Sequence, residues 1–224
     1  HGRSSRDDPT YRLTALPDRP PQVRVLEPAR DVMVARDQKV AIELEATDDW
    51  GVTELGLVHT LSGRPERLTV ARPPERSRSA RSSYTIELAL RGLRGGEIIT
   101  YYPWAIDNDG VNGPKESIGE VRFLRTYDEE RYGVPGERAQ RTPRAVREVE
   151  RLISRQMELI RKTFDAVRSA PGPERPGAEE RRAGLERLAA DQDDLRRDLD
   201  GFVRQVEEEL ARSDEDSRAA MREQ

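Results

Sequence analysis

Cysteine is absent from this sequence, and lysine, histidine and aromatic residues are scarce. Without cysteine, neither a disulfide framework nor a cysteine-ligated metal site can form. No apolar run approaches the roughly 18 residues of a membrane-spanning helix, and residues 1–21 lack the apolar core of a signal peptide. These absences exclude a disulfide-rich module and a membrane span within the sequence.

Charged side chains are abundant instead, at 37% of the 224 residues, against about 25% in an average globular domain. The two signs are mixed and the formal net charge is only −4, so the strongly basic face of a nucleic-acid-binding protein is not expected. The excess of acidic residues falls after residue 127. We therefore expect a near-neutral first part with an ordinary core, followed by a charged, solvated helical part that needs a neighbour.

Residues 22–127 contain short runs of alternating polar and apolar residues, which are typical of β-strands. Seven or eight such runs, with no helix between them, predict an all-β Ig-like antiparallel sandwich of the fibronectin type III kind. In the clearest run, the apolar residues that share one face are Val40, Ile42, Leu44 and Ala46. Further runs are expected at 23–25, 32–34, 55–61, 68–70, 84–90, 98–106 and 118–124, with a polar loop at 72–82.

Two features concern the expected strand at 98–106. The glycines at 92–96 followed by Tyr101 resemble the approach to the penultimate strand of Ig-like and fibronectin-type domains, where a tyrosine packs at the sheet corner. Pro103 cannot donate a hydrogen bond to a strand ladder, so it predicts an edge position or a bulge.

From residue 142 the apolar residues recur at the three- and four-residue spacing of a helix. Thr142-Pro143 is a typical helix start, and a Pro- and Gly-rich turn at 171–177 separates two stripes with heptad spacing. They predict an antiparallel, coiled-coil-like helical hairpin over 142–212. The first stripe is Val146, Val149, Ile153, Gln156, Ile160, Thr163 and Val167, and the second is Leu185, Leu188, Gln192, Leu195, Leu199, Phe202 and Val206.

The remaining segments are short. Residues 1–21 are predicted to be a linker or the last strand of an upstream module, and residues 128–141 a second linker. Ser213-Asp214-Glu215-Asp216 resembles a capping box, which predicts the start of a further, truncated helix at 213–224. Because the first residue is His1, we expect a fragment of a longer protein.

Acidic residues gather in two of the expected turns. Asp48 and Asp49 lie in one, and Asp107 and Asp109 in the other. In an Ig-like sandwich these turns share one end of the domain, so their carboxylates are candidate ligands of Ca²⁺, which prefers oxygen donors. The alternative is that the side chains only cap their own turns.

Trp50 and Trp104 are candidates for an exposed binding surface, for example for sugars, with core or rim packing as the alternative. His59 lies in phase with Leu55 and Leu57 and is expected to be a partly buried structural residue. The arginines at 72, 76, 78 and 81 predict either a solvated basic loop or a contact with anionic groups.

No nucleotide-binding loop, nucleophile elbow or metalloprotease motif is present. We therefore expect no enzymatic activity, no catalytic residues and no cofactor apart from the candidate calcium ion. A hydrolase using two carboxylates stays a third hypothesis, which needs a pocket with paired acids about 5–10 Å apart.

Several short segments carry a resemblance to one group of proteins. They are Pro20-Pro21-Gln22-Val23, Thr47-Asp48-Asp49-Trp50-Gly51-Val52, Gly96-Glu97 and the stretch from Tyr101-Tyr102 to Asp107-Asn108. Over about residues 10–210 the chain resembles large, N-terminally membrane-anchored bacterial proteins of unknown function, which carry an extracytoplasmic Ig-like module followed by long helices. Trp50 stands where that family usually has tyrosine. The resemblance implies a periplasmic location and membrane segments upstream of His1, and it offers no catalytic residues to carry over.

The function expected from the sequence is that of a non-enzymatic, extracytoplasmic interaction or scaffold fragment. Its helical hairpin is expected to bind a protein partner or to self-associate. The alternative is a calcium-dependent adhesion or carbohydrate-binding module.

Overall fold

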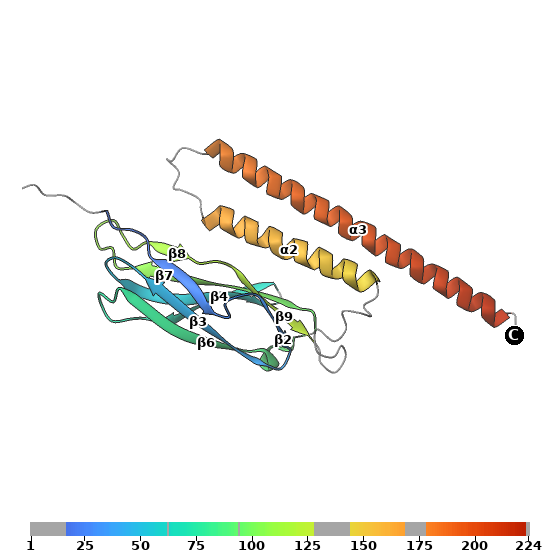
Figure 1. The fold of residues 1–224 in the computed structure, drawn as a ribbon, viewed down its shortest axis with the longest axis horizontal. Helices are drawn as coiled ribbons and strands as arrows, with labels where there is room; N and C mark the ends of the chain where they lie inside the picture. Colours follow the sequence, from blue (N-terminus) through green and yellow to red (C-terminus); the bar gives the residue numbers. More distant parts are fainter. Residues whose placement is uncertain (1–16, 62, 94, 128–143, 169–177, 223–224) are drawn as a thin grey trace, which may run out of the picture.

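The computed structural model describes residues 17–61, 63–93, 95–127, 144–168 and 178–222. They form a β-sheet domain followed by two helices, α2 (Arg144–Arg168) and α3 (Ala178–Arg222) (Figure 1). The predicted change from strands to helices is confirmed. The predicted linker at 128–141, and residues 1–16 of the predicted N-terminal segment, lie outside the described residues.

The strands of the described residues form two sheets. Sheet A has the order β1-β3-β6, made of β1 (Gln22–Glu27), β3 (Lys39–Thr47) and β6 (Ser79–Glu87). Sheet B has the order β2-β9-β7-β4-β5, and β8 pairs with β7. Its strands are β2 (Val32–Ala35), β4 (Val52–Leu61), β5 (Arg64–Ala71), β7 (Ile98–Asp107), β8 (Glu116–Ile118) and β9 (Arg122–Tyr127).

The expectation of purely antiparallel sheets is wrong for one pair. β2 runs parallel to β9, with Val32 opposite Leu124, whereas all other pairings among the described strands are antiparallel. The chain leaves sheet A after β1 and enters sheet B at β2. It therefore reaches the edge of sheet B running in the same direction as β9.

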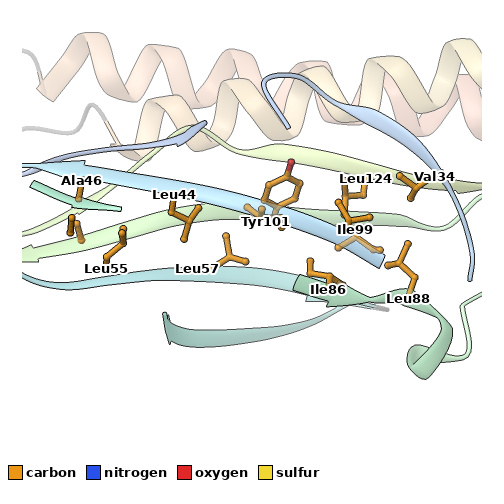
Figure 2. Packing of buried hydrophobic residues seen from close by; sticks show 14 of the residues in the cluster. Val34, Leu44, Ala46, Leu55, Leu57, Ile86, Leu88, Ile99, Tyr101 and Leu124 are labelled. Carbon is orange, nitrogen blue, oxygen red and sulfur yellow. The ribbon is translucent and has the colours of Figure 1, made fainter. Parts of the chain in front are cut away.

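The core lies between the two sheets. The predicted inner face of β3 is buried, with Ile42, Leu44 and Ala46 all at 0% exposure, and it packs with residues of sheet B such as Leu57 and Tyr101 (Figure 2). Burying a leucine or isoleucine side chain completely contributes about 1.5–3 kcal/mol. The alternation that predicted the strand thus supplies much of the force that brings the sheets together.

Tyr101 is fully buried in this core. Its hydroxyl has no hydrogen-bond partner among the described residues, which departs from the tyrosine of Ig-type corners. Burial raises the pKa of Tyr101 well above its usual value.

Two predicted strands end or divide differently in the structure. The strand expected to run to Leu90 ends at Glu87, and a short 3-10 helix (Leu88–Arg91) follows, which buries Leu88 and leaves Leu90 77% exposed. The run at 118–124 is split between β8 and β9. β6 begins at Ser79, so the predicted loop at 72–82 is shorter than expected.

Pro103 lies inside the central strand β7, opposite Leu57 of β4, so the predicted edge position is wrong. Its carbonyl accepts a hydrogen bond from the Gly119 N–H (2.8 Å). On that side β7 pairs with β9 up to Tyr101 and with β8 from Trp104. The missing N–H of the proline therefore faces the gap between two neighbouring strands, where a ladder bond is not required.

α2 lies between sheet B and α3 (Figure 1). On one side the ring of Phe164 contacts Tyr102 of β7 in a tilted arrangement, with ring centroids 4.5 Å apart. On the same side Arg161 pairs with Asp31 at 2.6 Å. On the other side Leu152 and Leu159 pack against Leu195 of α3.

The helix stripes differ from the expected ones. Val146, Val149 and Val167 of the predicted first stripe are exposed, because α2 turns the adjacent leucines toward α3. In the second stripe Leu188, Leu195 and Phe202 do pack toward α2, whereas Leu185 and Leu199 are about half exposed. α3 continues through Ser213 to Arg222 without a break, so no new helix starts at residue 213.

Candidate functional site

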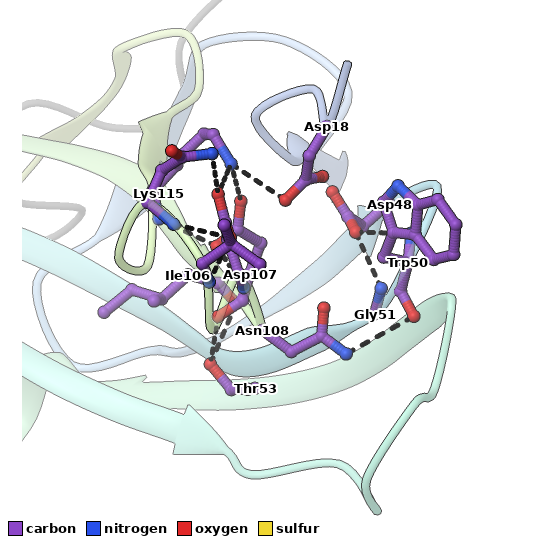
Figure 3. A network of polar contacts seen from close by, with 12 residues as sticks. Asp18, Asp48, Trp50, Gly51, Thr53, Ile106, Asp107, Asn108 and Lys115 are labelled. Atoms are coloured by element: carbon purple, nitrogen blue, oxygen red, sulfur yellow. Dashed lines mark hydrogen bonds and ion pairs between the residues drawn. The ribbon is translucent and has the colours of Figure 1, made fainter. Parts of the chain in front are cut away.

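The two acidic turns meet at one end of the β-domain (Figure 3). The Asn108 amide Nδ2 donates to the Trp50 carbonyl (3.4 Å), and the Thr53 hydroxyl donates to the carbonyls of Ile106 and Asp107. A Cβ on Gly51 would lie 2.8 Å from Asn108 Nδ2 and 3.1 Å from the Cα of Arg76. Glycine at position 51 therefore lets three loops, around residues 50, 76 and 108, approach one another.

Asp48 caps its own turn. Its Oδ2 accepts hydrogen bonds from the backbone N–H groups of Trp50 (2.8 Å) and Gly51 (2.7 Å). This is the turn-capping role given above as the alternative to metal binding. Only Oδ1 of this carboxylate has no such bond, and it is buried without a hydrogen-bond partner among the described residues.

Asp107 and Asp109 are held by a lysine. Lys115 Nζ lies 2.5 Å from Asp109 Oδ2, 2.8 Å from Asp18 Oδ2 and 3.5 Å from Asp107 Oδ2. Backbone N–H groups add to the cluster, because Asp109 Oδ1 accepts from Val111 and Asp107 Oδ1 accepts from Lys115. The ammonium group therefore occupies the position where a cation bound by this pair would lie.

The hydrogen bond from Lys115, with those from two backbone N–H groups, holds the pKa of Asp109 far below its usual range. The same contact with Asp109, and a second with Asp18, raise the pKa of Lys115. Asp109 and Lys115 are consequently both ionised over the whole neutral range.

The structure divides the four predicted carboxylates into two groups. Asp107 and Asp109 belong to the lysine cluster, whereas Asp48 and Asp49 lie beside Asp18, and these three residues have carboxylate oxygens within 4.8 Å of one another. Asp18 Oδ1, like Asp48 Oδ1, is buried without a hydrogen-bond partner among the described residues. The carboxylate oxygens of this second acidic group lie close enough together to share a cation.

Sequence reasoning missed Asp18 and Lys115. Asp18 precedes the first strand, in a segment expected to be a linker, so no strand pattern pointed to it. Lys115 carried a signal that was available, since it is one of only three lysines in a chain whose other basic residues are arginines.

The two tryptophans have different environments. Trp50 is 50% exposed beside Asp48, whereas Trp104 is only 2% exposed, so the two do not form one exposed platform. Trp104 lies on the outer face of sheet B under Arg67, whose guanidinium carbon is 3.8 Å from the ring centroid. Arg67 is itself held by two hydrogen bonds of 2.9 Å to Glu116.

The other singled-out residues have structural contacts. His59 is fully buried, stacks on Tyr84 and lies 3.5 Å from Glu66. Of the predicted basic loop, Arg72 pairs with Glu54 and Arg81 with Glu45. Two of the four arginines are therefore paired with acidic residues of the β-domain, and Arg76 and Arg78 are exposed.

A separate open cleft of about 360 Å³ lies where α2 meets the β-domain. Arginine and acidic side chains line it together, and two pairs are close, Arg161 with Asp31 and Arg122 with Glu120. The acidic residues of the loop end do not line this cleft. The remaining lining residues are Arg30 and Asp165.

Comparisons with known proteins give no family. No family profile matches the chain, and no curated protein does. Among the described residues, no helix is long and apolar enough to cross a membrane.

Several solved structures are distantly similar. A beta-glucosidase from Listeria innocua, solved with glucose, shares 5% identity over 50% of this chain with a TM-score of 0.31. A Niemann-Pick type C2 protein from Japanese carpenter ant shares 7% identity over 48% of this chain, with a TM-score of 0.29. The sporulation control protein Spo0M from Bacillus subtilis shares 9% identity over 61% of this chain, with a TM-score of 0.26.

The matched regions cover 16% of the glucosidase, 91% of the Niemann-Pick protein and 55% of Spo0M. Similarities this low carry no argument about what the chain binds or does.

Proposed function

We propose that this chain is a non-enzymatic interaction and scaffold fragment from the extracytoplasmic, periplasmic part of a bacterial membrane-anchored protein. Its β-domain is an Ig-like sandwich of the fibronectin type III kind, and α2 and α3 form a coiled-coil-like hairpin that binds a protein partner or a second copy. The division of the strands into β1-β3-β6 and β2-β9-β7-β4-β5 supports the sandwich, because Ig-type domains divide their strands between two facing sheets.

One observation carries the assembly part of this proposal. Leu199, Val203 and Leu210 of α3 are 48%, 45% and 62% exposed, and spacings of four and seven residues put them on one side of the helix. The neighbouring Leu195 is buried against α2. An exposed apolar stripe beside a buried one is the pattern of a helix that takes a second helical partner.

The test uses the full chain with Leu199→Glu and Val203→Glu combined. The matched control is Ala189→Glu with Ala190→Glu, which adds the same charge at exposed positions. Sedimentation analysis should show self-association, or binding to the rest of the parent protein, that the stripe variant loses and the control keeps. A wild-type chain that neither self-associates nor binds the parent protein through α3 would reject the assembly role.

A calcium-dependent adhesion or carbohydrate-binding module is the second candidate. The two buried carboxylate oxygens without partners, on Asp18 and Asp48, favour a cation beside Asp49. The exposed ring of Trp50 next to them is a suitable stacking surface for a sugar. Asp107 and Asp109 are not part of this revised site, because Lys115 neutralises them. Lys115 also contacts Asp18 through its Oδ2, so Asp18 would bind the cation through Oδ1.

Calorimetry and thermal unfolding with and without Ca²⁺ test this candidate. Binding should raise the melting temperature, and Asp18→Asn should abolish the rise, whereas Asp37→Asn, at an exposed position on the β2–β3 turn, should leave it intact. No heat and no change in melting temperature would reject the metal. A glycan array with Trp50→Ala as the negative control tests the sugar.

A further inference from the structure

β6 is a regular strand at the edge of sheet A. All nine of its residues pair with β3 in continuous register, from Ser79 opposite Thr47 to Glu87 opposite Lys39. No described strand pairs with its other side. One full edge of the strand is therefore open to a further strand.

The hydrogen bonds at the two ends of β6 show which of its residues turn their backbone N–H and C=O groups away from β3. The Leu88 N–H donates to the Gln38 carbonyl (3.1 Å), and the Arg78 carbonyl accepts from the Asp48 N–H (2.9 Å). In an antiparallel ladder, alternate residues turn both backbone groups toward the same neighbour. The even-numbered residues of β6 thus face β3, and the groups that face outward belong to Ser79, Arg81, Ser83, Thr85 and Glu87.

The other edges carry features that prevent strand pairing. β1 has a register shift between Val25 and Glu27, and Gly119 approaches it closely enough that a Cβ there would lie 2.8 Å from the Val23 carbonyl. β5 contains Pro65, and β2 has only four residues. Proteins commonly protect edge strands with proline, lysine, irregular register or short length, and β6 has none of these.

We propose that β6 pairs antiparallel with β6 of a second copy of this chain, joining the two A sheets into one continuous sheet. The two-fold axis passes through Tyr84, so that each Arg81 lies opposite Glu87 of the other copy and each Ser83 opposite Thr85. This register brings opposite charges together on the exposed face, which favours antiparallel pairs. It also brings together the two Tyr84 rings on the inner side.

A second copy of the chain is the expected partner because the charges of β6 are complementary to those of an antiparallel β6. The Arg81 and Glu87 side chains are 64% and 40% exposed. Each already pairs with a β3 residue at 2.7 Å, Arg81 with Glu45 and Glu87 with Lys39, so a partner strand would extend these pairs into a ladder across both copies. A strand whose positive and negative residues lie symmetrically about one residue, here Tyr84, fits its own copy in a two-fold arrangement. The association is separate from the proposed one through α3, because it involves the opposite sheet from the one that α2 covers.

The first test compares Ser83→Pro with Ser83→Thr in the full chain. The Ser83 N–H faces outward, so proline leaves the ladder with β3 intact while removing a central bond of the new pair. Sedimentation equilibrium up to about 1 mM should give a dimer for the wild type and the threonine variant, and dimerisation at least about tenfold weaker for the proline variant. A wild-type monomer at all concentrations, or a proline variant that dimerises equally well, would overturn the proposal.

The second test examines the register and does not depend on the proline variant folding. Arg81→Glu and Glu87→Lys should each weaken dimerisation by about tenfold, because each places like charges opposite one another twice. An equimolar mixture of the two variants should regain wild-type affinity, since every facing pair is again of opposite charge. Mixtures that stay monomeric would reject this register, and loss of the dimer in Leu199→Glu with Val203→Glu would assign the association to α3 instead.

Discussion

At the scale of single residues, Gly56 shows how one position can determine the packing of a whole sheet face. It lies on β4 opposite Trp104, and a Cβ there would be 2.2 Å from the indole Cε2 and 2.3 Å from the Leu68 carbonyl. Only glycine leaves room for the ring at this position. The buried position of Trp104, and with it the stacking of Arg67, depends on this absence of a side chain.

Gly56→Ala is therefore expected to destabilise the β-domain by about 1–3 kcal/mol or more, as overpacking of a buried site does. Urea unfolding followed by tryptophan fluorescence measures the change. Gly110→Ala is the matched control, because a Cβ at that position meets nothing within 4 Å, and it should change stability by less than about 0.5 kcal/mol. Equal effects of the two substitutions would contradict this account of Gly56.

Lys115 gives the stability of the domain a defined pH dependence. The folded pKa of Asp109 lies below its ordinary value, so its contribution is present above about pH 4 and is lost as the pH falls through the folded pKa. The folded pKa of Lys115 is raised, so its contribution is complete below about pH 10 and is lost as the pH rises further.

Lys115→Met should lower stability at neutral pH, because it leaves the buried carboxylate of Asp107 without its counter-charge. It should also flatten the fall in stability between about pH 5 and pH 2, because Asp109 loses the contact that depresses its pKa. Denaturant unfolding across a pH series measures both effects. An unchanged acid slope would show that other carboxylates dominate the acid transition.

At the scale of elements, α2 has two partners and its sequence reflects both. Phe164 and Arg161 contact the β-domain, and Leu152 and Leu159 contact α3. Asp31 joins the two parts, because it accepts the Phe123 N–H (3.1 Å) as well as pairing with Arg161. A helix that packs against two partners has a broader apolar surface than the single narrow stripe of a heptad pattern. The heptad stripe therefore did not predict the contacts of α2.

Phe164→Ala should loosen α2 from sheet B at a cost of about 1–2 kcal/mol, the transfer free energy of a half-buried aromatic ring. Hydrogen exchange should become faster in α2 and leave β3 unchanged. Val167→Ala is the control on the same helix, because Val167 is 61% exposed. Equal exchange in the wild type and the Phe164 variant would mean that this contact does not hold the helix.

At the scale of the whole molecule, the two faces of the β-domain differ in character. The outer face of sheet A is polar and carries an ion-pair ladder in which Glu45 joins Arg24 and Arg81. The outer face of sheet B carries Val58, Trp104 and Phe123, which are all at most 5% exposed. The helices are thus a third and fourth layer over one face of the domain (Figure 1).

A chain that ends after Tyr127 should accordingly expose part of this apolar face, since exposed apolar patches promote association. We expect stronger binding of a hydrophobic dye and lower solubility than for the full chain. A control fragment that ends at Arg168 keeps the α2 contacts with the sheet but exposes Leu152 and Leu159, which pack on α3 in the full chain. With both leucines changed to glutamate, this control fragment should bind little dye. Equal dye binding by the shorter fragment and the full chain would show that the face is self-sufficient.

The sequence by itself determined the local elements of this protein. Alternation in β3 and the helical periods after residue 142 reflect side-chain directions that repeat along a strand or a helix, so they can be read without knowing the neighbours. The sequence analysis also expected the two acidic turns to share one end of the domain, and in the structure they meet there. What could not be read was the partner of each charged or apolar group.

Only the tertiary structure decided those partners. It assigned Asp107 and Asp109 to Lys115, brought Asp18 to Asp48, buried Trp104 over Gly56 and placed α2 against sheet B. The residues in each of these contacts are not related by the repeat of a strand or a helix, so no periodic pattern in the sequence reveals the contact. Their energies depend on burial and on distances of a few ångströms, which are properties of the packed molecule and not of any local stretch of sequence.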